Sequence, residues 1–357
     1  MKSSNDKMKA AVLERIGEIV VKEVDIPVCP EDSILIKVEA CAICGSDLRI
    51  FKKVDKRVKF PQIIGHEIAG RIVKIGRMVK GFKIGDRVIS LPGPSCGKCI
   101  YCKEGFDTQC LNMIHIGYNW PGGFAQYHIP PSRSLKKGRC FINKIPDNLP
   151  FEEACIAELL GCCINAQEFS NVRKNDSVAI IGGGPAGCMH IELAKLRGAN
   201  KVFLVQRSQT RLKMAKNKFN ADVFISSQSE DFVERILKET NGYGVDVVIV
   251  ACSSKEAQEK SLKIIKGKGR INFFGGLSAD DSIINIDSNI VHYKECIIQG
   301  SQSSTGIHNR KALKLFSDRK INAKDFITHI FPLSRIKEAI KIAETGMGLK
   351  IVVKPWL

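Results

Sequence analysis

The sequence predicts an α/β protein built from a partly open β-barrel and a doubly wound parallel sheet. The chain has 357 residues, more than the roughly 100–200 of a typical single domain, so two domains are expected. Short runs of alternating apolar and polar residues fill the first part of the chain, whereas apolar strands alternate with helical patterns from Ser177 onward. The first pattern is typical of a small barrel and the second of right-handed βαβ units.

The barrel is predicted from two stretches of short strands. From Lys7 to about Val38, apolar–polar alternation is broken by Pro and Gly, and the stretch from Ile68 to Ile89 repeats this pattern. Residues 90–123 are rich in Gly, Pro and Cys, so they are predicted to form loops.

The parallel sheet is predicted from four apolar segments, each expected to be a strand: residues 177–181, 201–205, 245–250 and 270–274. The helix after the first strand is expected to carry Met189, Leu193 and Leu196 on one face. Leu212, Ala215 and Phe219 mark the helix after the second strand. After residue 300, two further helical patterns precede a last strand over residues 350–353.

The composition excludes several classes of protein. With 44% hydrophobic and 26% charged residues, the chain is ordinary for a globular protein, which argues against disordered, collagen-like and membrane classes. No apolar run approaches the roughly 18 residues that a membrane-spanning helix needs. The first residues, Met1 to Lys7, are not followed by the apolar core of a signal peptide. We therefore expect a cytosolic protein with no membrane partner.

The net charge is strongly positive, since 55 Lys and Arg against 37 Asp and Glu leave +18. Such a balance suggests an anionic partner, of which nucleic acid is one class. The cations are spread along the chain, however, and the densest segment, residues 51–57, is interrupted by an acid and apolar residues. We therefore expect no nucleic-acid partner, and note that an anionic dinucleotide would benefit from the same field.

Fourteen cysteines in a chain without a leader are more typical of metal ligands and free thiols than of disulfides. Four of them lie within a Gly/Pro-rich loop, with two, two and seven residues between them: Cys96, Cys99, Cys102 and Cys110. Four thiolates can close a tetrahedral shell around a structural zinc ion. A zinc ribbon for nucleic acid is the alternative, but it pairs two separated Cys-x-x-Cys knuckles rather than three cysteines in series.

A glycine fingerprint predicts a dinucleotide site. Residues 182–187 read Gly-Gly-Gly-Pro-Ala-Gly, directly after a predicted strand and at the start of a helix. In this motif Gly182 permits the tight turn, Gly184 lets the backbone approach the pyrophosphate, and Gly187 lets helix and strand pack closely. The first helical amides, around Pro185 and Ala186, would bind the phosphates. The alternative is a tight turn that binds nothing.

The end of the second strand indicates which coenzyme is used. An NAD site usually has Asp or Glu there to bind the ribose hydroxyls, whereas this chain has Gln206 followed by Arg207, Ser208 and Arg211. No carboxylate would repel a 2′-phosphate, and a guanidinium can bind one through two hydrogen bonds. These residues favour NADP over NAD, unless the arginines are simply exposed residues of a basic protein.

A second metal site is suggested by Cys44-Gly45-Ser46-Asp47 together with Gly65-His66-Glu67. A catalytic zinc ion needs about three protein ligands and one open position. Cys44, His66 and a carboxylate would fill that role, with Glu67 or Glu158 as the carboxylate. Ser46 would hold a hydroxyl within proton-relay reach of the metal. Alone, a cysteine and a distant histidine would more often be core residues.

These motifs give the chain a clear resemblance: it resembles the zinc-dependent medium-chain dehydrogenases, over nearly its whole length and in the same motif order. Within that family it is most similar to the sorbitol (L-iditol 2-) dehydrogenase branch, in which glutamate stands at the position of Glu158. The motifs that carry the resemblance are residues 44–47, 65–67, 85–88 (Gly-Asp-Arg-Val), 273–277 (Phe-Phe-Gly-Gly-Leu), 292–295 (His-Tyr-Lys-Glu), the four cysteines and the glycine fingerprint.

The resemblance implies a GroES-like catalytic domain over residues 1–155 and 298–357, with a Rossmann domain over 156–297. It also implies a catalytic and a structural zinc ion in each chain, a nicotinamide ring near Cys252, Phe274 and Gly275, and a homo-dimer or homo-tetramer. The expected reaction transfers a hydride between a secondary alcohol of a polyol, possibly a phosphorylated one, and NAD(P), with Cys44, Ser46, His66, Glu67 and Glu158 at the catalytic site.

Departures from the family pattern leave the substrate open. The Arg-Tyr pair that polyol dehydrogenases use on substrate is replaced by Ser303-Ser304, and Arg49 stands where many relatives have His or Lys. The alternatives are a threonine-dehydrogenase-like enzyme, a dehydrogenase of simple alcohols, and a catalytically silent relative that binds NADP. Tyr118 and Trp120 are candidates to line the substrate pocket.

Overall fold

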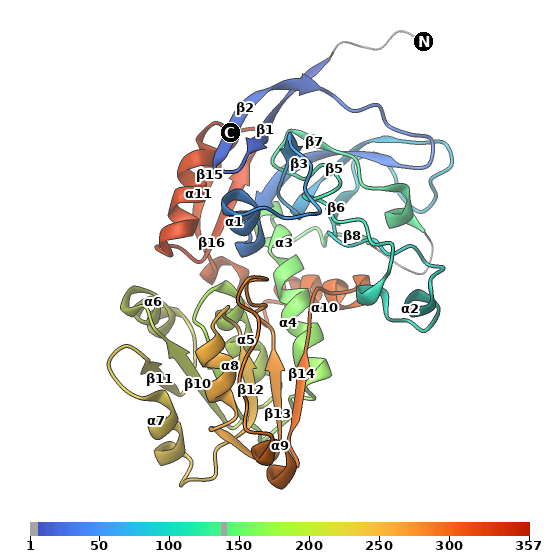
Figure 1. Ribbon diagram of the computed structural model, residues 1–357. Helices are drawn as coiled ribbons and strands as arrows, with labels where there is room; N and C mark the ends of the chain where they lie inside the picture. The colour runs from blue at the N-terminus through green and yellow to red at the C-terminus, as the bar shows by residue number, and fades with distance from the viewer. Residues whose placement is uncertain (1–5, 137–140) are drawn as a thin grey trace. The chain divides into compact units, whose positions relative to one another are not determined.

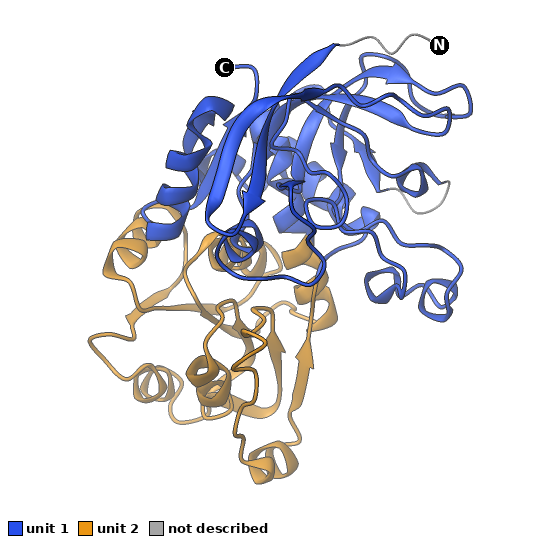
Figure 2. Cartoon of the chain, turned by 45° about the horizontal axis from the view of Figure 1, so that its top comes forward, with its two compact units in different colours: residues 1–161, 303–357 blue, residues 162–302 orange. Residues whose placement is uncertain are grey.

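The structure, a computed structural model, describes residues 6–136 and 141–357. The chain forms two compact units, one of residues 1–161 and 303–357 and the other of residues 162–302 (Figure 2). Each is described by itself below. The domain boundaries expected from the sequence, after residues 155 and 297, remain a prediction.

The first unit is built on two sheets, labelled in Figure 1. A three-stranded antiparallel sheet has the order β2-β1-β4, and a seven-stranded sheet has the order β15-β16-β3-β5-β6-β8, with β7 paired to β3. The strands of the first sheet are β1 (Lys7–Arg15), β2 (Glu18–Asp25) and β4 (Gln62–Ile63). Those of the second are β3 (Ile34–Ala42), β5 (Glu67–Ile75), β6 (Arg87–Ser90), β7 (Tyr127–His128), β8 (Ile142–Lys144), β15 (Ile327–Pro332) and β16 (Lys350–Lys354).

Alternation along these strands explains why they form a barrel-like core. In β1, for example, Lys7 and Lys9 are exposed while Met8 and Ala10 are buried, and the strand then continues with the buried residues 11–13. Residues from both sheets and from one C-terminal helix form a single apolar cluster, which includes Phe124 and Ile351. The helices of this unit are α1 (Gly45–Lys52), α2 (Ile100–Lys103), α3 (Phe151–Cys155), α10 (Gly306–Ser317) and α11 (Ile336–Thr345); α4 (Ala157–Phe169) begins here and ends in the second unit.

The C-terminal strand is held in the middle of the larger sheet. Val352 of β16 pairs with Ala42 of β3, and the same Ala42 pairs with Glu67 of β5 on its other side. In this register, β3 lies between the last strand of the chain and the first residues of β5. The sequence predicted β16, but it did not predict its parallel partner β15, which is a short strand with only one buried residue, Phe331.

The second unit is a six-stranded parallel sheet with the order β11-β10-β9-β12-β13-β14. In order along the chain this is 3-2-1-4-5-6, the doubly wound arrangement that binds dinucleotides where the strand order reverses. The elements are β9 (Ser177–Ile181), α5 (Pro185–Leu196), β10 (Lys201–Gln206), α6 (Gln209–Lys218), β11 (Val223–Ser226), α7 (Phe232–Glu239), β12 (Val245–Val250), α8 (Lys255–Ser261), β13 (Ile265–Phe273), α9 (Ser288–Lys294) and β14 (Ile297–Gly300).

The sheet confirms the predicted α/β class, and the continuous apolar strands are explained by burial on both faces. Two details of the prediction were wrong. Leu196 is 43% exposed, because it lies at the C-terminal end of α5 rather than on the buried face with Met189 and Leu193. The strand expected over 270–274 begins earlier, at Ile265, and ends at Phe273, since Lys266–Gly269 continue the strand outside the apolar stretch.

Candidate active site

The candidate active site begins at the N-terminus of α1, where Asp47 joins two loops. The backbone N–H of Cys44 donates to Asp47 Oδ2 at 2.8 Å, and the N–H of Gly65 donates to Asp47 Oδ1 at 3.2 Å. The same Oδ1 lies 3.3 Å from Nδ1 of His66. Asp47 is itself buried. One carboxylate therefore fixes the loop that carries Cys44 and the imidazole of His66.

The contact of Nδ1 with Asp47 leaves Nε2 of His66 to face the site. Ser46 Oγ lies 3.5 Å from Nε2. Burial disfavours the charged imidazolium, but the negative charge of Asp47 and its hydrogen bond outweigh burial and raise the pKa of His66 well above its usual range. A histidine whose Nδ1 is held by a carboxylate is oriented for metal binding through Nε2.

Glu67, the first residue of β5, completes a buried cluster with Cys44 and His66. We call these three residues the buried cluster. Their ligand atoms all lie within 4.8 Å of one another. Burial alone would raise the pKa of the Cys44 thiol, yet the hydrogen bond and charge of His66 lower it to about 7. Glu67 is fully buried, and its Oε2 has no hydrogen-bond partner within residues 6–136 and 141–357. A thiolate, an imidazole and a carboxylate oxygen that lacks a partner fit the ligand set of a catalytic zinc ion.

Glu158, the second residue of α4, lies near this cluster but is not one of its three converging residues. It is 5% exposed, and its charge acts on both Glu67 and Lys350. Lys350, on β16, forms an ion pair with Oε1 of Glu67. The sequence analysis missed Lys350. The only available signal was a lysine at the start of an apolar strand, and such a lysine is usually exposed.

Ser46 leads from the buried cluster to a chain of polar side chains. Ser46 acts on the hydroxyl of Tyr118, since it lowers the pKa that burial of this group raises, and the Tyr118 ring lies 6.3 Å from that of His66, centroid to centroid. The guanidinium of Arg57 stacks 4.3 Å above the Tyr118 ring and pairs with Asp55 through two hydrogen bonds of 2.9 and 2.7 Å. Tyr118 was predicted to line a pocket; the structure adds Arg57 and Asp55, which the sequence analysis did not identify.

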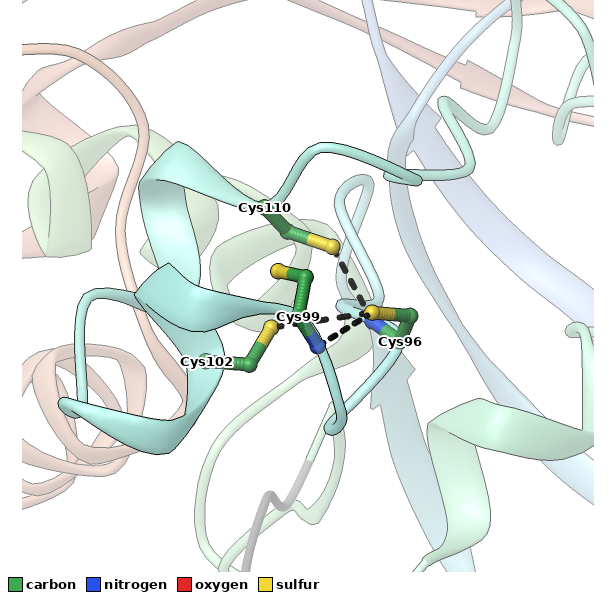
Figure 3. Close-up of side chains that lie close together, drawn as sticks. All are labelled: Cys96, Cys99, Cys102 and Cys110. Carbon is green, nitrogen blue, oxygen red and sulfur yellow. Dashed lines mark hydrogen bonds between the residues drawn. The ribbon is translucent and has the colours of Figure 1, made fainter.

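The four cysteines of the loop converge, as Figure 3 shows. Their ligand atoms lie within 4.8 Å of one another, and Cys96 Sγ is 3.9 Å from Cys102 Sγ, too far apart for a disulfide bond. Backbone N–H groups of Lys98 and Cys99 lower the pKa of Cys96 to about 6, which favours the thiolate that binds metal. Cys96, Cys99, Cys102 and Cys110, here called the cysteine quartet, fit a closed tetrahedral zinc site.

A cleft of about 770 Å³ lies in the second unit, beside the ends of β9, β10 and β12. Gly182 has φ +113°, a conformation that favours glycine, and a Cβ on Gly187 would lie 1.8 Å from the carbonyl oxygen of Gly182. Gly184, in contrast, has open space beside it. The fingerprint therefore forms the tight turn, the close packing and the open backbone approach that its spacing predicts.

The predicted coenzyme residues fall into two groups. Those that line the cleft are Gly182, Gln206, Arg207, Arg211 and Cys252. The other described candidates do not line it; these are Gly184, Pro185, Ala186, Gly187, Ser208, Phe274 and Gly275. Ser208 instead accepts the N–H of Arg211 at 3.4 Å and caps α6, and the Phe274 ring packs edge-on to His190. The sequence analysis missed the wall formed by residues 227–232, because this wall follows a strand that carried no motif.

Gln206 is drawn toward the glycine turn. Its Oε1 accepts the N–H of Gly183 at 2.8 Å. Arg211 is partly buried, and burial lowers its pKa. Glu230, Asp231 and Glu256 also line the cleft, so that its wall carries both signs of charge. The cleft is large enough for part of a dinucleotide, with the guanidinium groups next to Gln206 at the strand end where the ribose would bind.

Two family models match the chain. Residues 30–139 match the alcohol dehydrogenase GroES-like domain, and residues 185–318 match the zinc-binding dehydrogenase model. Among the described residues, no helix is both long and apolar enough to cross a membrane.

Several curated proteins are similar to the whole chain. L-threonine 3-dehydrogenase of Caldanaerobacter subterraneus is 34% identical, with 98% of this chain and 100% of that protein covered. D-arabitol-phosphate dehydrogenase of Enterococcus avium is 31% identical, with 93% and 92% covered. Sorbitol dehydrogenase of Halalkalibacterium halodurans is 31% identical, with 98% and 99% covered.

Solved structures have the same fold. A zinc-binding dehydrogenase of Sinorhizobium meliloti, bound to NADP, has a TM-score of 0.90 at 30% identity, with 98% of this chain and 100% of that chain covered. An alcohol dehydrogenase of Escherichia coli CFT073, complexed with NADH, has a TM-score of 0.87 at 25% identity, with 98% and 99% covered. Both nicotinamide coenzymes therefore occur among proteins of this fold.

Proposed function

The chain belongs to the zinc-dependent medium-chain dehydrogenases and is an alcohol dehydrogenase, and from this premise we propose that it oxidises a secondary alcohol of a polyol to a ketone with NADP. The resemblance predicted from the sequence motifs is thereby confirmed, as is the prediction of an oxidoreductase. The observation that carries the proposal is the convergence of Cys44, His66 and Glu67 within 4.8 Å, with the imidazole held by Asp47 and a carboxylate oxygen that has no hydrogen-bond partner among the described residues.

Each residue at the site has a role in the proposed reaction. Cys44, His66 and Glu67 would hold a zinc ion, which would supply a Lewis acid at the alcohol oxygen, and the bound nicotinamide coenzyme would supply the hydride acceptor. Ser46 would take the hydroxyl proton of the alcohol and give up its own, by way of the nearby Tyr118 hydroxyl, toward solvent. Glu158 adds negative charge beside this set and is the alternative carboxylate ligand.

We propose two zinc ions per chain, one in the buried cluster and one in the cysteine quartet. Metal analysis of the purified protein by mass spectrometry tests this stoichiometry. Two equivalents are expected, whereas one would favour a catalytically silent relative that keeps only the quartet. That outcome would overturn the proposed activity, because the buried cluster would then lack its Lewis acid.

NADP is the proposed coenzyme because the end of β10 carries no carboxylate, and Arg207 and Arg211 line the cleft there. Titration of NADPH and NADH, followed by nicotinamide fluorescence, should give tighter binding of NADPH. Arg207→Ala should weaken NADPH but not NADH. Lys216→Ala, which removes an exposed cation of α6, the helix that follows Arg207, should change neither. Equal binding of both coenzymes to the wild type would overturn the proposed preference.

The substrate class is proposed from the relatives and tested by screening. Two curated relatives are named for polyol or polyol-phosphate oxidation and a third for L-threonine. A panel of sorbitol, arabitol, their phosphates, L-threonine and simple alcohols should give the highest kcat/KM with a polyol or its phosphate. A preference for L-threonine would instead support the second candidate, which the 34% identity to a threonine dehydrogenase favours.

We also propose a homo-dimer or homo-tetramer. The edge strand β14 is paired on one side with β13, and Ile297 on this strand is 56% exposed. Tyr293 and Ile283, earlier in the chain, are also largely exposed. An open edge with apolar side chains favours pairing with a second copy. Light scattering after size-exclusion chromatography tests this, and Ile297→Lys should shift the protein toward monomer.

A further inference from the structure

Lys350 is a lysine whose charge is buried beside the candidate zinc ligands. Its side chain is 1% exposed, and Nζ contacts Oε1 of Glu67 and lies 3.3 Å from the carbonyl oxygen of Ile43. Burial favours the neutral amine, but the charge of Glu67 outweighs it and raises the pKa of Lys350. Lysine is almost never fully buried unless it is paired, so the pair needs a reason.

The pair makes the two oxygens of Glu67 unequal. Oε1 is held by the ammonium of Lys350, whereas Oε2 is buried and has no hydrogen-bond partner. A buried carboxylate oxygen without a partner is costly, and a metal ion on that side would relieve the cost. The ligand atoms of the other two candidates, Cys44 and His66, lie within 4.8 Å of one oxygen of this carboxylate.

The backbone keeps this arrangement rigid. Lys350 is the first residue of β16, and Glu67 is the first residue of β5; both strands flank β3 and pair with it at Ala42. Both side chains are therefore carried by the central part of the larger sheet rather than by loops. Rotation of the Glu67 carboxylate to present both oxygens to one side would break its ion pair with Lys350.

We propose that Lys350 is a positioning residue that restricts Glu67 to binding zinc through one oxygen and so keeps one position of the metal open for substrate. This rests on the proposed function, namely that the buried cluster binds zinc. A catalytic zinc ion keeps three protein ligands and an open position, and a carboxylate that bound through both oxygens would occupy that position. The ammonium of Lys350 pairs with Oε1 of Glu67, which leaves Oε2 for the metal ion.

The test replaces zinc with Co²⁺ in the intact protein and records the visible absorption spectrum, which is intense for four ligands and weaker for five. Cobalt in the cysteine quartet contributes as well, so the spectrum of Cys44→Ser, which keeps only the quartet, is subtracted. Lys350→Met should lose intensity at full cobalt occupancy and lose activity, whereas Lys350→Arg should keep the wild-type spectrum. Lys354→Met, on the same strand but half-buried, is the matched control and should also keep it.

Three results overturn the proposal: an unchanged spectrum in Lys350→Met, a spectrum of Lys350→Arg that matches Lys350→Met, or loss of cobalt from Lys350→Met alone. The last would mean that the lysine secures the carboxylate rather than limiting it. If Lys350→Met does not fold, Lys350→Gln, which is also uncharged, should show the same loss of intensity. Failure of the proposed function is distinct, because wild-type protein would then bind only one equivalent of cobalt.

Discussion

The two candidate metal sites of the first unit are built in opposite ways. The cysteine quartet takes all its ligands from residues 96–110, a loop with two short helical turns. The buried cluster takes Cys44 from the start of α1 and His66 and Glu67 from the start of β5, and it is completed by Lys350 from the end of the chain. In this protein a single loop brings the four cysteines of the quartet together, whereas the folded sheet is needed to bring together the ligands of the buried cluster.

The electrostatics of the two sites differ in the same way. Backbone N–H groups are the main cause that lowers the pKa of Cys96 in the quartet. In the buried cluster, side-chain groups act on Cys44, chiefly His66 and Lys350. Backbone amides give a fixed, local stabilisation of thiolates, while side-chain charges can be tuned one at a time. This difference suits a structural ion in the quartet and a chemically active ion in the cluster.

The largest effect is expected from Cys44→Ser. Because the loss of a ligand removes the Lewis acid, worth several kcal/mol at the reacting oxygen, kcat/KM should fall by at least about a thousandfold. Metal analysis should show one zinc ion in place of two. Cys29→Ser, which changes a partly exposed thiol remote from both sites, is the control. Retention of both zinc ions in Cys44→Ser would contradict the assignment of Cys44 as a zinc ligand of the buried cluster.

Cys102→Ser should break the quartet instead. One zinc ion should again be lost, but the consequence is lower stability, because the loop loses the metal ion that would join its four cysteines. We expect the unfolding temperature to fall by roughly 5–10 °C, which corresponds to a few kcal/mol. Activity at 25 °C should fall much less than in Cys44→Ser. A folded Cys102→Ser protein without activity would show that the quartet is not merely structural.

The same contrast explains what the sequence could predict. The quartet is visible from spacing alone, because its ligands are neighbours along the chain. Cys44, His66 and Glu67 gain meaning only from their combination, and the sequence left Glu67 and Glu158 as equal candidates. Lys350 could not be found, since its partner is 283 positions away and only strand register joins them. Likewise, the glycine turn was predicted, but not the cleft wall at residues 227–232.

Asp47→Asn tests how far the buried cluster depends on a residue that orients its ligands. Asp47 uses both oxygens as acceptors, for Cys44, Gly65 and His66, and asparagine keeps only one. Metal affinity or activity should fall by about 10–100-fold, as is typical for residues that orient metal ligands. Asp107→Asn is the matched change beside the quartet, where Ser95 donates to Oδ1 at 2.7 Å and an amide oxygen can still accept. Similar losses of metal affinity or activity in Asp47→Asn and Asp107→Asn would contradict the distinction between the buried cluster, which depends on side-chain groups, and the quartet, which depends on backbone groups.

The smallest effect is expected from Tyr118→Phe, which removes the hydroxyl to which we propose that Ser46 passes the proton. A single hydrogen bond contributes about 0.5–1.5 kcal/mol, so kcat should fall by roughly 2–10-fold while both zinc ions and the unfolding temperature are retained. Because the ring still stacks under Arg57, the packing of the pocket is preserved. The acid limb of the pH–rate profile reports whether the hydroxyl helps to move the proton. If kcat and this limb stay at the wild-type values, the proton leaves Ser46 by another route, and the buried cluster acts without the polar chain that reaches from Ser46 to Asp55.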